Sequence, residues 1–248
     1  MLDRSTEEGV SGVAAGDLTG DGRPDLAYTL FGSEEEAYLR TMLSEPDGHT
    51  AGDGRTFSPA QLRVAVGDVN GDGQAELAVG NSGTARHRGR VEIFPGRATG
   101  PNLDGARQEI NQSTSGVPGT GEDNDEFGDS VTLHDVDDDG YADIAIGVPG
   151  EDIGRVVDAG RIVTIPGSAR GLATGRTTGI NQGTPDIPGS VERGDEFGGY
   201  VDYRAGTAAG AVGLMVGAPG EDSGEGRTYV LGDDQAWWFK PSHAGIEV

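Results

Sequence analysis

Three short segments of the chain carry oxygen-bearing side chains at matching positions, and loops of this kind bind hard metal ions. The segments span residues 17–25, 68–76 and 135–143, and each has Asp, Glu, Asn or Thr at positions 1, 3, 5 and 9. Calcium takes about six to eight oxygen ligands, which a tight loop can supply from alternate side chains and from the backbone carbonyl at position 7. The glycine at position 6 of each segment permits the sharp turn that such a loop needs.

The expected ligands follow from these positions. The residues at position 7 would contribute backbone carbonyl oxygens, so their side chains are not part of the coordination. The ligand sets are Asp17, Thr19, Asp21, Arg23 and Asp25; Asp68, Asn70, Asp72, Gln74 and Glu76; and Asp135, Asp137, Asp139, Tyr141 and Asp143. We therefore expect three structural calcium ions and no other cofactor, because carboxylates held this close would repel each other without a cation.

The acidic loops fit an EF-hand or a plain turn less well than a calcium loop between strands. An EF-hand has a bidentate Glu at position 12 and a helix on each side, whereas position 12 here is Tyr28, Val79 or Ile146 within strand-like runs. Loops rich in Asp, Asn and Gly also make good hairpin turns without any metal. Three such loops with the same oxygen pattern favour metal binding over plain turns.

The sequence indicates no catalytic residue. It contains no nucleophile elbow, no phosphate-binding glycine loop that opens a helix, and no zinc-protease helix. The four histidines are scattered without the spacing of a metal site. The paired acids Glu151-Asp152 and Glu221-Asp222 could act on a sugar, but both pairs follow equivalent turns and are interpreted as turn residues.

The elements that must position these loops are predicted to be strands. Apolar runs of three to six residues, rich in β-branched types, are bounded by Gly, Pro, Asp or Asn. Only residues 34–43 have a composition that favours a helix, and a strand there fits the rest of the pattern better. The runs lie at residues 64–66, 77–79, 91–94, 144–146, 162–165 and 229–231.

The chain repeats itself with a period of about 70 residues, which indicates a repeat architecture. The segment Asp125-Glu126-Phe127-Gly128 recurs 70 residues later, and so does Gly147-Val148-Pro149-Gly150, as Gly217-Ala218-Pro219-Gly220. Approximate repeats of one domain, residues 1–248, are 1–52, 53–121, 122–191 and 192–248. Several strands in each repeat predict radial blades of antiparallel sheet.

These motifs resemble the FG-GAP repeat of integrin α-subunit β-propellers and of related bacterial secreted proteins. The third repeat resembles it throughout, the fourth at its FG and GAP ends, and the first two mainly in the calcium loop and the following strand. The resemblance implies an all-β fold, a β-propeller or partial propeller, with one four-stranded antiparallel blade per repeat. It also implies calcium loops between neighbouring strands on one face of the propeller.

The chain departs from the family pattern in two respects. Residues 202–210, which correspond to a fourth loop, lack the alternating acids, so three calcium ions are expected and not four. The family propeller usually has seven blades, whereas four repeats fill this chain. It could be a fragment, a truncated gene product, a subunit that closes with a partner, or an unusually small propeller.

Composition limits the partners. The 42 acidic and 18 basic residues give a formal charge of −24, which argues against binding to nucleic acid or to anionic membranes. No run approaches the ~18 apolar residues of a membrane span, and the polar, acidic first residues do not form a signal peptide. Leu, Ile, Val and Phe make up only about a fifth of the chain, which borders on disordered composition. We therefore expect a fold that depends on calcium.

Together these features suggest a calcium-binding, non-catalytic module for extracellular adhesion that binds a protein or carbohydrate ligand of unknown identity. An extracellular or cell-surface location is implied by the family resemblance. Remaining blades or a second subunit are further expected partners. The alternative is a propeller-type enzyme, a hydrolase or lyase with a central pocket and structural calcium. Arg193-Gly194-Asp195 spells a tripeptide that integrins recognise, but only its Asp belongs to the repeat, so we do not interpret it as an adhesion ligand.

Overall fold

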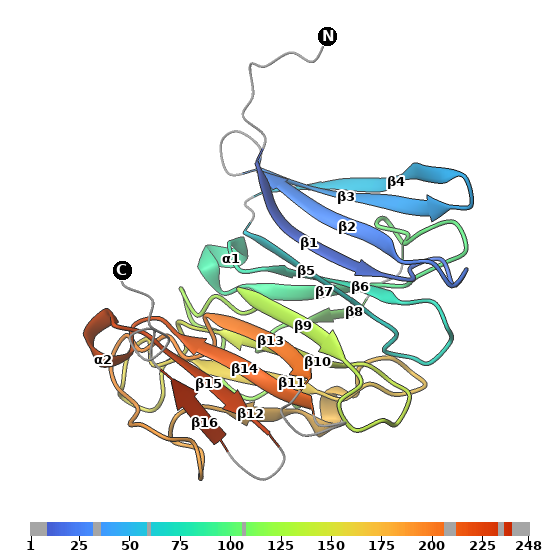
Figure 1. Ribbon diagram of the computed structural model, residues 1–248. Coiled ribbons are helices and arrows are strands. Elements are labelled where there is room, and N and C mark those ends of the chain that lie inside the picture. Colours follow the sequence, from blue (N-terminus) through green and yellow to red (C-terminus); the bar gives the residue numbers. More distant parts are fainter. Residues whose placement is uncertain are drawn as a thin grey trace.

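The chain folds into four antiparallel sheets of four strands each, and in every sheet neighbouring strands follow one another in the sequence. The structure is a computed structural model that describes residues 9–31, 36–58, 61–105, 108–205, 212–232 and 236–239. Figure 1 shows the sheets following one another from the N-terminal sheet to the C-terminal sheet. The predicted all-β fold of four-stranded antiparallel blades is confirmed.

Loops join the consecutive strands of each sheet; most of them have eight or more residues, and residues 46–47 between β3 and β4 make a two-residue turn. The first sheet contains β1 (Val10–Gly16), β2 (Asp25–Phe31), β3 (Ala37–Glu45) and β4 (Gly48–Phe57), and the second β5 (Leu62–Gly67), β6 (Glu76–Asn81), β7 (Arg90–Phe94) and β8 (Gln108–Ile110). The third contains β9 (Ser130–His134), β10 (Asp143–Val148), β11 (Arg161–Ile165) and β12 (Thr178–Ile180), and the fourth β13 (Tyr200–Ala205), β14 (Val212–Ala218), β15 (Arg227–Leu231) and β16 (Ala236–Phe239).

Two expectations concern the first sheet. Residues 37–45 form strand β3, so the segment with helix-favouring composition is a strand, although residues 32–35 lie outside the described part. The expected boundary between residues 52 and 53 falls inside β4, and the first sheet continues to Phe57.

Helices are minor elements of this fold. The described helices α1 (Thr84–His87) and α2 (Glu221–Gly224) have a single turn each, and a 3-10 turn covers Thr174–Arg176. In the described part of the chain, no helix is long and apolar enough to cross a bilayer.

The apolar core lies between successive sheets and not inside any one of them. One buried cluster joins the first and second sheets, around Leu39 and Phe94. A second joins the second and third sheets, around Ile93 and Ile144, and a third joins the third and fourth sheets, around Phe197. A small number of bulky residues is therefore enough to fill the core, because an inner sheet contributes both of its faces to the packing.

The sheets form an arc that is not closed. The innermost strands β1, β5, β9 and β13 lie next to one another in that order. Among the described residues, no buried apolar cluster contains both the first and the fourth sheet. In β1, Val10 and Val13 remain 65% and 64% exposed. The fold is therefore a partial β-propeller.

The FG motif of each later sheet docks on the sheet before it. Phe197 is fully buried and forms a parallel bridge with Gly160 of the third sheet. The backbone N–H of Gly198 donates to the carbonyl oxygen of Gly217, 2.9 Å away. A Cβ atom at Gly147, on β10, would overlap the carbonyl oxygen of Gly198. The GAP glycine is therefore needed because two backbones touch at this point.

The same contact recurs one sheet earlier. Phe127 is fully buried and bridges to Gly89, and a Cβ atom at Gly80 would overlap the carbonyl oxygen of Gly128. The matched spacing of the two motifs along this chain thus corresponds to one repeated contact between neighbouring sheets.

Replacing the GAP glycine should weaken the contact between the third and fourth sheets. Gly147→Ala is expected to lower the free energy of unfolding by about 1–3 kcal/mol, because the added methyl group forces the two backbones apart. Chemical denaturation would measure this loss. Gly175→Ala is the control, since a Cβ atom at Gly175 meets nothing within 4 Å. Equal stability of the two variants would contradict the contact.

Candidate functional site

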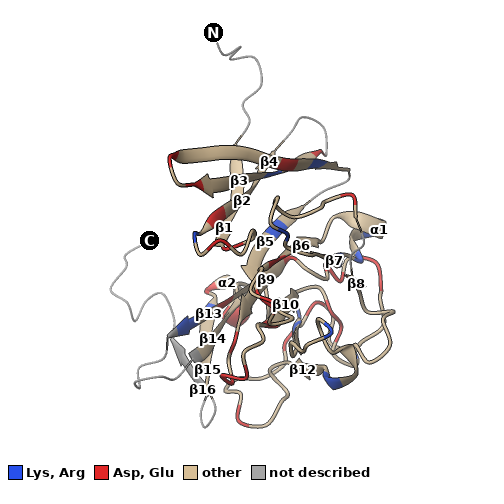
Figure 2. Cartoon of the chain, turned by 90° about the vertical axis from the view of Figure 1, so that its right-hand side faces the viewer, with Lys and Arg blue, Asp and Glu red and all other residues tan. Residues whose placement is uncertain are grey.

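The three acidic segments occupy the same place in three consecutive sheets. Each one is the hairpin loop between the first and second strands: β1 and β2, β5 and β6, or β9 and β10. Position 1 follows the last residue of the first strand, and position 9 begins the second strand. Figure 2 shows acidic residues along the loops. The sequence pattern therefore corresponds to a recurring structural position.

Within each loop, the first carboxylate accepts several backbone hydrogen bonds. Asp17 accepts from the N–H groups of Gly20 and Gly22, each at 2.7 Å. Asp68 accepts in the same way from Gly71 at 2.7 Å and Gly73 at 2.8 Å. The third loop repeats this geometry with Asp135, which accepts from the N–H groups of Asp139 at 3.1 Å and Gly140 at 2.9 Å. These bonds wrap each loop around its first carboxylate.

The position 6 glycine and the position 5 acid complete the turn. Gly22, Gly73 and Gly140 have φ angles of 84°, 84° and 89°, which side-chain-bearing residues rarely adopt. The carboxylates at position 5 accept from the N–H groups at position 7 at distances of 2.9, 2.9 and 3.0 Å, in the pairs Asp21–Arg23, Asp72–Gln74 and Asp139–Tyr141.

The acid at position 9 is buried and anchors its loop to a strand. Asp25 accepts from the N–H groups of Thr19 at 3.1 Å and Ser44 at 2.8 Å. Glu76 accepts from the N–H of Val69 at 2.9 Å, and burial raises its pKa to about 7, with Asp72 and Asp68 adding to the rise.

The third loop repeats this anchor. Asp143 accepts from the N–H groups of Val136 at 3.4 Å and Gly167 at 2.9 Å. Burial also raises the pKa of Asp143, and the negative charges of Asp137 and Asp139 add to the rise. Nearby negative charge thus opposes ionisation of this buried acid.

The donor set of the third loop fits a hard cation. Asp135, Asp137 and Asp139 each place a carboxylate oxygen within 4.8 Å of the others. In the first loop the corresponding acid Asp21 forms an ion pair with Arg23 at 2.7 Å. All ligand atoms predicted in the three loops are oxygens, which suits calcium better than a softer metal ion.

The three loops are also linked from sheet to sheet. The carbonyl oxygen of Asp17 accepts from the N–H of Ala75 at 2.8 Å, and that of Asp68 accepts from Ala142 at 2.7 Å. The side chains at position 7 contribute to the same joint: a Cβ atom on Gly71 would lie 2.8 Å from the ring of Tyr141. The side chain of Tyr141 therefore packs on the preceding acidic loop, in addition to any role of its backbone carbonyl as a metal ligand.

The expected loss of the fourth loop concerns residues 202–210. Of these, residues 206–210 lie outside the described part of the chain.

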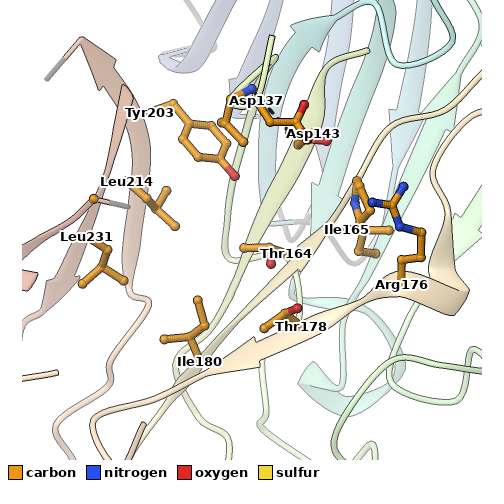
Figure 3. A pocket seen from close by; sticks show the side chains of 13 residues that line it. Asp137, Asp143, Thr164, Ile165, Arg176, Thr178, Ile180, Tyr203, Leu214 and Leu231 are labelled. Carbon is orange, nitrogen blue, oxygen red and sulfur yellow. Dashed lines mark hydrogen bonds between the residues drawn. The ribbon is translucent and has the colours of Figure 1, made fainter. Parts of the chain in front are cut away.

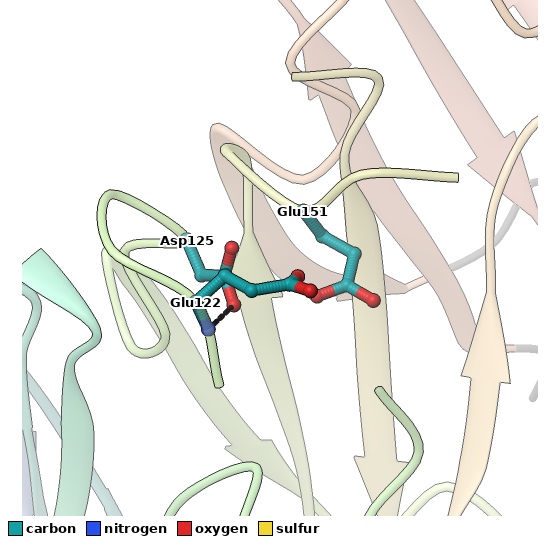
Figure 4. A group of neighbouring side chains, drawn as sticks. All are labelled: Glu122, Asp125 and Glu151. Carbon is teal, nitrogen blue, oxygen red and sulfur yellow. Dashed lines mark hydrogen bonds between the residues drawn. The ribbon is translucent and has the colours of Figure 1, made fainter. Parts of the chain in front are cut away.

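A second acidic group lies outside the residues that the sequence pattern indicated. Glu122, Asp125 and Glu151 place carboxylate oxygens within 4.8 Å of one another, and Figure 4 shows the side chains meeting beside β10. We name these three residues the carboxyl cluster. The amide nitrogen of Gln112 donates to Glu151, and Arg161 forms an ion pair with Glu151 at 3.2 Å. Glu151 is therefore not simply a turn residue, because its side chain is buried between two sheets.

The same arrangement recurs in the fourth sheet. Gln182 donates to Glu221, which is buried and forms an ion pair with Arg227 at 2.7 Å. Asp195, of the integrin-recognised tripeptide, is 1% exposed and accepts from the N–H of Glu192 at 2.7 Å. It is therefore not presented to a receptor. The signal for the cluster was the repetition of Gln, Glu, Asp and Glu at matched positions in both repeats, followed by an Arg that begins the third strand of each sheet.

Burial perturbs the acids of the carboxyl cluster. It raises the pKa of Glu151 to about 7; the positive charge of Arg161 acts in the opposite direction, and the negative charges of Asp125 and Glu122 add to the rise. Burial also raises the pKa of Asp125 to about 6, with Glu122 and Asp152 adding to it. Ionisation of both acids is thus less favourable inside the fold than in water.

This perturbation predicts a pH-dependent stability. Between its ordinary pKa of 4.5 and about 7, Glu151 holds a proton in the folded chain that the unfolded chain releases. Its contribution is therefore fully present below the ordinary pKa and is lost as the pH rises through about 7. Glu151→Gln cannot ionise, so its free energy of unfolding should fall less than that of the parent between pH 5 and 8, by about 1–3 kcal/mol.

Denaturant titrations at several pH values, with a chelator in every buffer, would measure this difference. Glu192→Gln is the charge-matched control, because Glu192 is the exposed repeat counterpart of Glu122. Parallel pH profiles for the parent and Glu151→Gln would contradict the prediction.

Comparison with known proteins agrees with this fold. The sequence model of the FG-GAP repeat family matches residues 62–92 and 127–165. These two matches include the second and third acidic loops and the FG motif at Phe127.

Two solved structures share the arrangement of strands. A rhamnogalacturonan lyase PL11 of Bacillus licheniformis has a TM-score of 0.51 at 13% identity, over 85% of this chain and 41% of the lyase. The exotype rhamnogalacturonan lyase YesX has a TM-score of 0.53 at 12% identity, over 95% of this chain and 48% of the lyase. At these identities the likeness concerns the fold alone, and the chain spans less than half the length of either lyase. The chain therefore contains FG-GAP repeats, at residues 62–92 and 127–165, and folds as a partial β-propeller.

Proposed function

We propose that the chain is a calcium-binding, non-catalytic FG-GAP propeller module that binds a protein or carbohydrate ligand outside the cell. The observation that carries the proposal is the convergence of Asp135, Asp137 and Asp139 in a loop whose oxygen pattern recurs in two other sheets. Calcium sites in extracellular modules bind weakly, at about 10⁻⁴–10⁻³ M, which suits exposed loops of this kind. The resemblance to the FG-GAP family supports the protein or carbohydrate ligand and the extracellular location.

In this proposal the loops hold the sheets together. Bound calcium would supply the positive charge that the grouped carboxylates lack. The carbonyl oxygens of Asp17 and Asp68 then keep each loop bonded to the next sheet, through Ala75 and Ala142. Ordering one loop therefore also orders the joint with its neighbour. A thin core depends on such joints more than a thick one does.

Because the arc of sheets is open, we expect a partner that covers its two ends. The described first and fourth sheets share no buried cluster, and β1 leaves Val10 and Val13 exposed. Blades that are not closed expose sheet faces and edges that tend to associate. Further blades or a second subunit would cover them.

Calcium should stabilise the fold, and one acid of the third loop should carry a measurable share. Each site adds about 2.7 kcal/mol when free calcium is a hundredfold above its dissociation constant. Asp139→Asn should remove the share of the third site, because it takes one carboxylate from the convergent group. Melting temperatures with calcium and with a chelator would show a smaller difference for this variant than for the parent.

The same loop offers a matched control. Asp138 lies between Asp137 and Asp139 at position 4, outside the ligand pattern, with a φ angle of 57° that Asn tolerates. Asp138→Asn changes the charge equally and should keep the calcium response of the parent. A parent melting temperature that does not respond to calcium would overturn the calcium proposal. Equal losses in the two variants would overturn the ligand assignment.

The second candidate is a lyase or hydrolase, and one observation favours it. Glu151 combines a pKa of about 7 with a guanidinium group 3.2 Å away, as a proton-transfer residue would. Incubation with rhamnogalacturonan, followed by the ultraviolet absorbance of unsaturated product, tests it. We expect no product. Product formation that Glu151→Gln abolishes would replace the non-catalytic proposal.

A further inference from the structure

A cleft of about 340 Å³ lies between the third and fourth sheets, beside the third metal loop. Figure 3 shows Tyr203 above it, Thr164 and Thr178 on one side, and Leu214 and Leu231 on the other. Its volume falls in the range of about 300–1,000 Å³ that is usual for small-molecule sites. All of its lining residues belong to the described part of the chain.

The polar side chains of this cleft have free hydrogen-bonding capacity. Tyr203, Thr164 and Thr178 carry hydroxyl groups, and Arg176 carries a guanidinium group. Among the described residues, these hydroxyls accept and donate no side-chain hydrogen bond, and Arg176 forms no ion pair. Four polar groups on one cleft therefore remain available to a bound molecule.

The equivalent interface between the second and third sheets is built differently. Ile93 stands where the third sheet has Thr164, and Leu133 stands where the fourth sheet has Tyr203. Both residues belong to or pack against the apolar cluster of that interface.

The third matched position shows the same contrast. Gln108 pairs with Ile93 across two strands in the same register in which Thr178 pairs with Thr164. The side-chain amide of Gln108 donates to the carbonyl oxygen of Leu172, 3.1 Å away. Among the described residues, the three matched positions between the second and third sheets are apolar or hydrogen-bonded within the protein. Between the third and fourth sheets the same positions carry hydroxyls without a protein partner.

Thr178 is exposed and Thr164 and Tyr203 are half-buried, so their hydroxyls are accessible from the cleft. A few polar groups of this kind on a cleft fix the orientation of a bound ligand. We propose that this cleft binds a neutral sugar of one or two rings. The inference rests on the proposed function, because it names the ligand class and the site of that module. The hydroxyl and guanidinium groups would bond the hydroxyls of the sugar. Ile180, Leu214 and Leu231 would pack against its C–H face.

Charge favours a neutral sugar over an acidic one. The chain has a formal charge of −24, and Asp137 and Asp143 lie at the edge of the cleft. An anionic ligand would be repelled by this field, whereas a neutral ligand is not. Arg176 alone does not reverse the local sign.

Ligand titration with neutral mono- and disaccharides, followed by calorimetry or ligand-observed NMR, tests the proposal. The probes are glucose, galactose, mannose, rhamnose and N-acetylglucosamine with their disaccharides, and galacturonate is the anionic comparison. At least one neutral sugar should bind saturably. Tyr203→Phe should weaken that binding roughly two- to tenfold, because it removes one hydrogen bond.

Two further variants locate the site. Tyr200→Phe is the matched control, since Tyr200 lies on the same strand β13 but is 49% exposed and donates to Asp202 at 3.2 Å. It should bind like the parent. Thr164→Ile with Tyr203→Leu rebuilds the apolar interface of the preceding sheets. It should abolish sugar binding while the melting temperature is kept or raised.

Each outcome decides the proposal. No binding by any neutral sugar, or binding of galacturonate alone, overturns it. Neutral-sugar binding that is unchanged in both Tyr203 variants also overturns it, because the ligand then sits elsewhere. The calcium response of the same samples is measured separately. A chain that responds to calcium but binds no sugar would lose only this inference, and one that binds sugar without a calcium response would lose only the metal sites.

Discussion

The fold depends on how closely two neighbouring sheets can approach. At Gly80 and Gly147 the backbone of one sheet touches a carbonyl oxygen of the next, and a single methyl group would prevent this. The buried Phe127 and Phe197 form backbone bridges to the preceding sheet beside these contacts. Because the apolar clusters lie between sheets, this separation decides whether the core is packed at all.

Acidic groups lie at the two ends of the contact between neighbouring sheets. Strand β10 begins at Asp143, in the third acidic loop, and ends three residues before Glu151, in the carboxyl cluster. At one end the acids are grouped in an exposed loop, where a cation can reach them. At the other end Glu151 is buried against Gln112 and Arg161, and burial raises its pKa to about 7. Negative charge is therefore tolerated at both ends of one strand for different physical reasons.

The repeats are alike in backbone and different in what their interfaces contain. Gln108 is bonded within the protein, whereas the hydroxyl of Thr178 at the matched position has no partner among the described residues. Ile93 is buried in an apolar cluster, whereas Thr164 lines a cleft. Such divergence within one chain is a useful guide to binding sites, because the neighbouring repeat shows what the structure alone requires.

Much of the fold could be predicted from the sequence: several strand-like runs, the 70-residue repeat, the FG-GAP motifs and the place of the three acidic loops between strands. These are local properties, since Gly at position 6 and alternating acids fix a turn before any packing occurs. The carboxyl cluster and the cleft were decided only by the tertiary structure. Glu122 and Glu151 meet because the loop before β9 packs on the loop after β10, whereas Thr164 and Tyr203 meet because consecutive sheets pack face to face. A linear pattern records which residues recur, but burial and distance between sheets decide which of them act together.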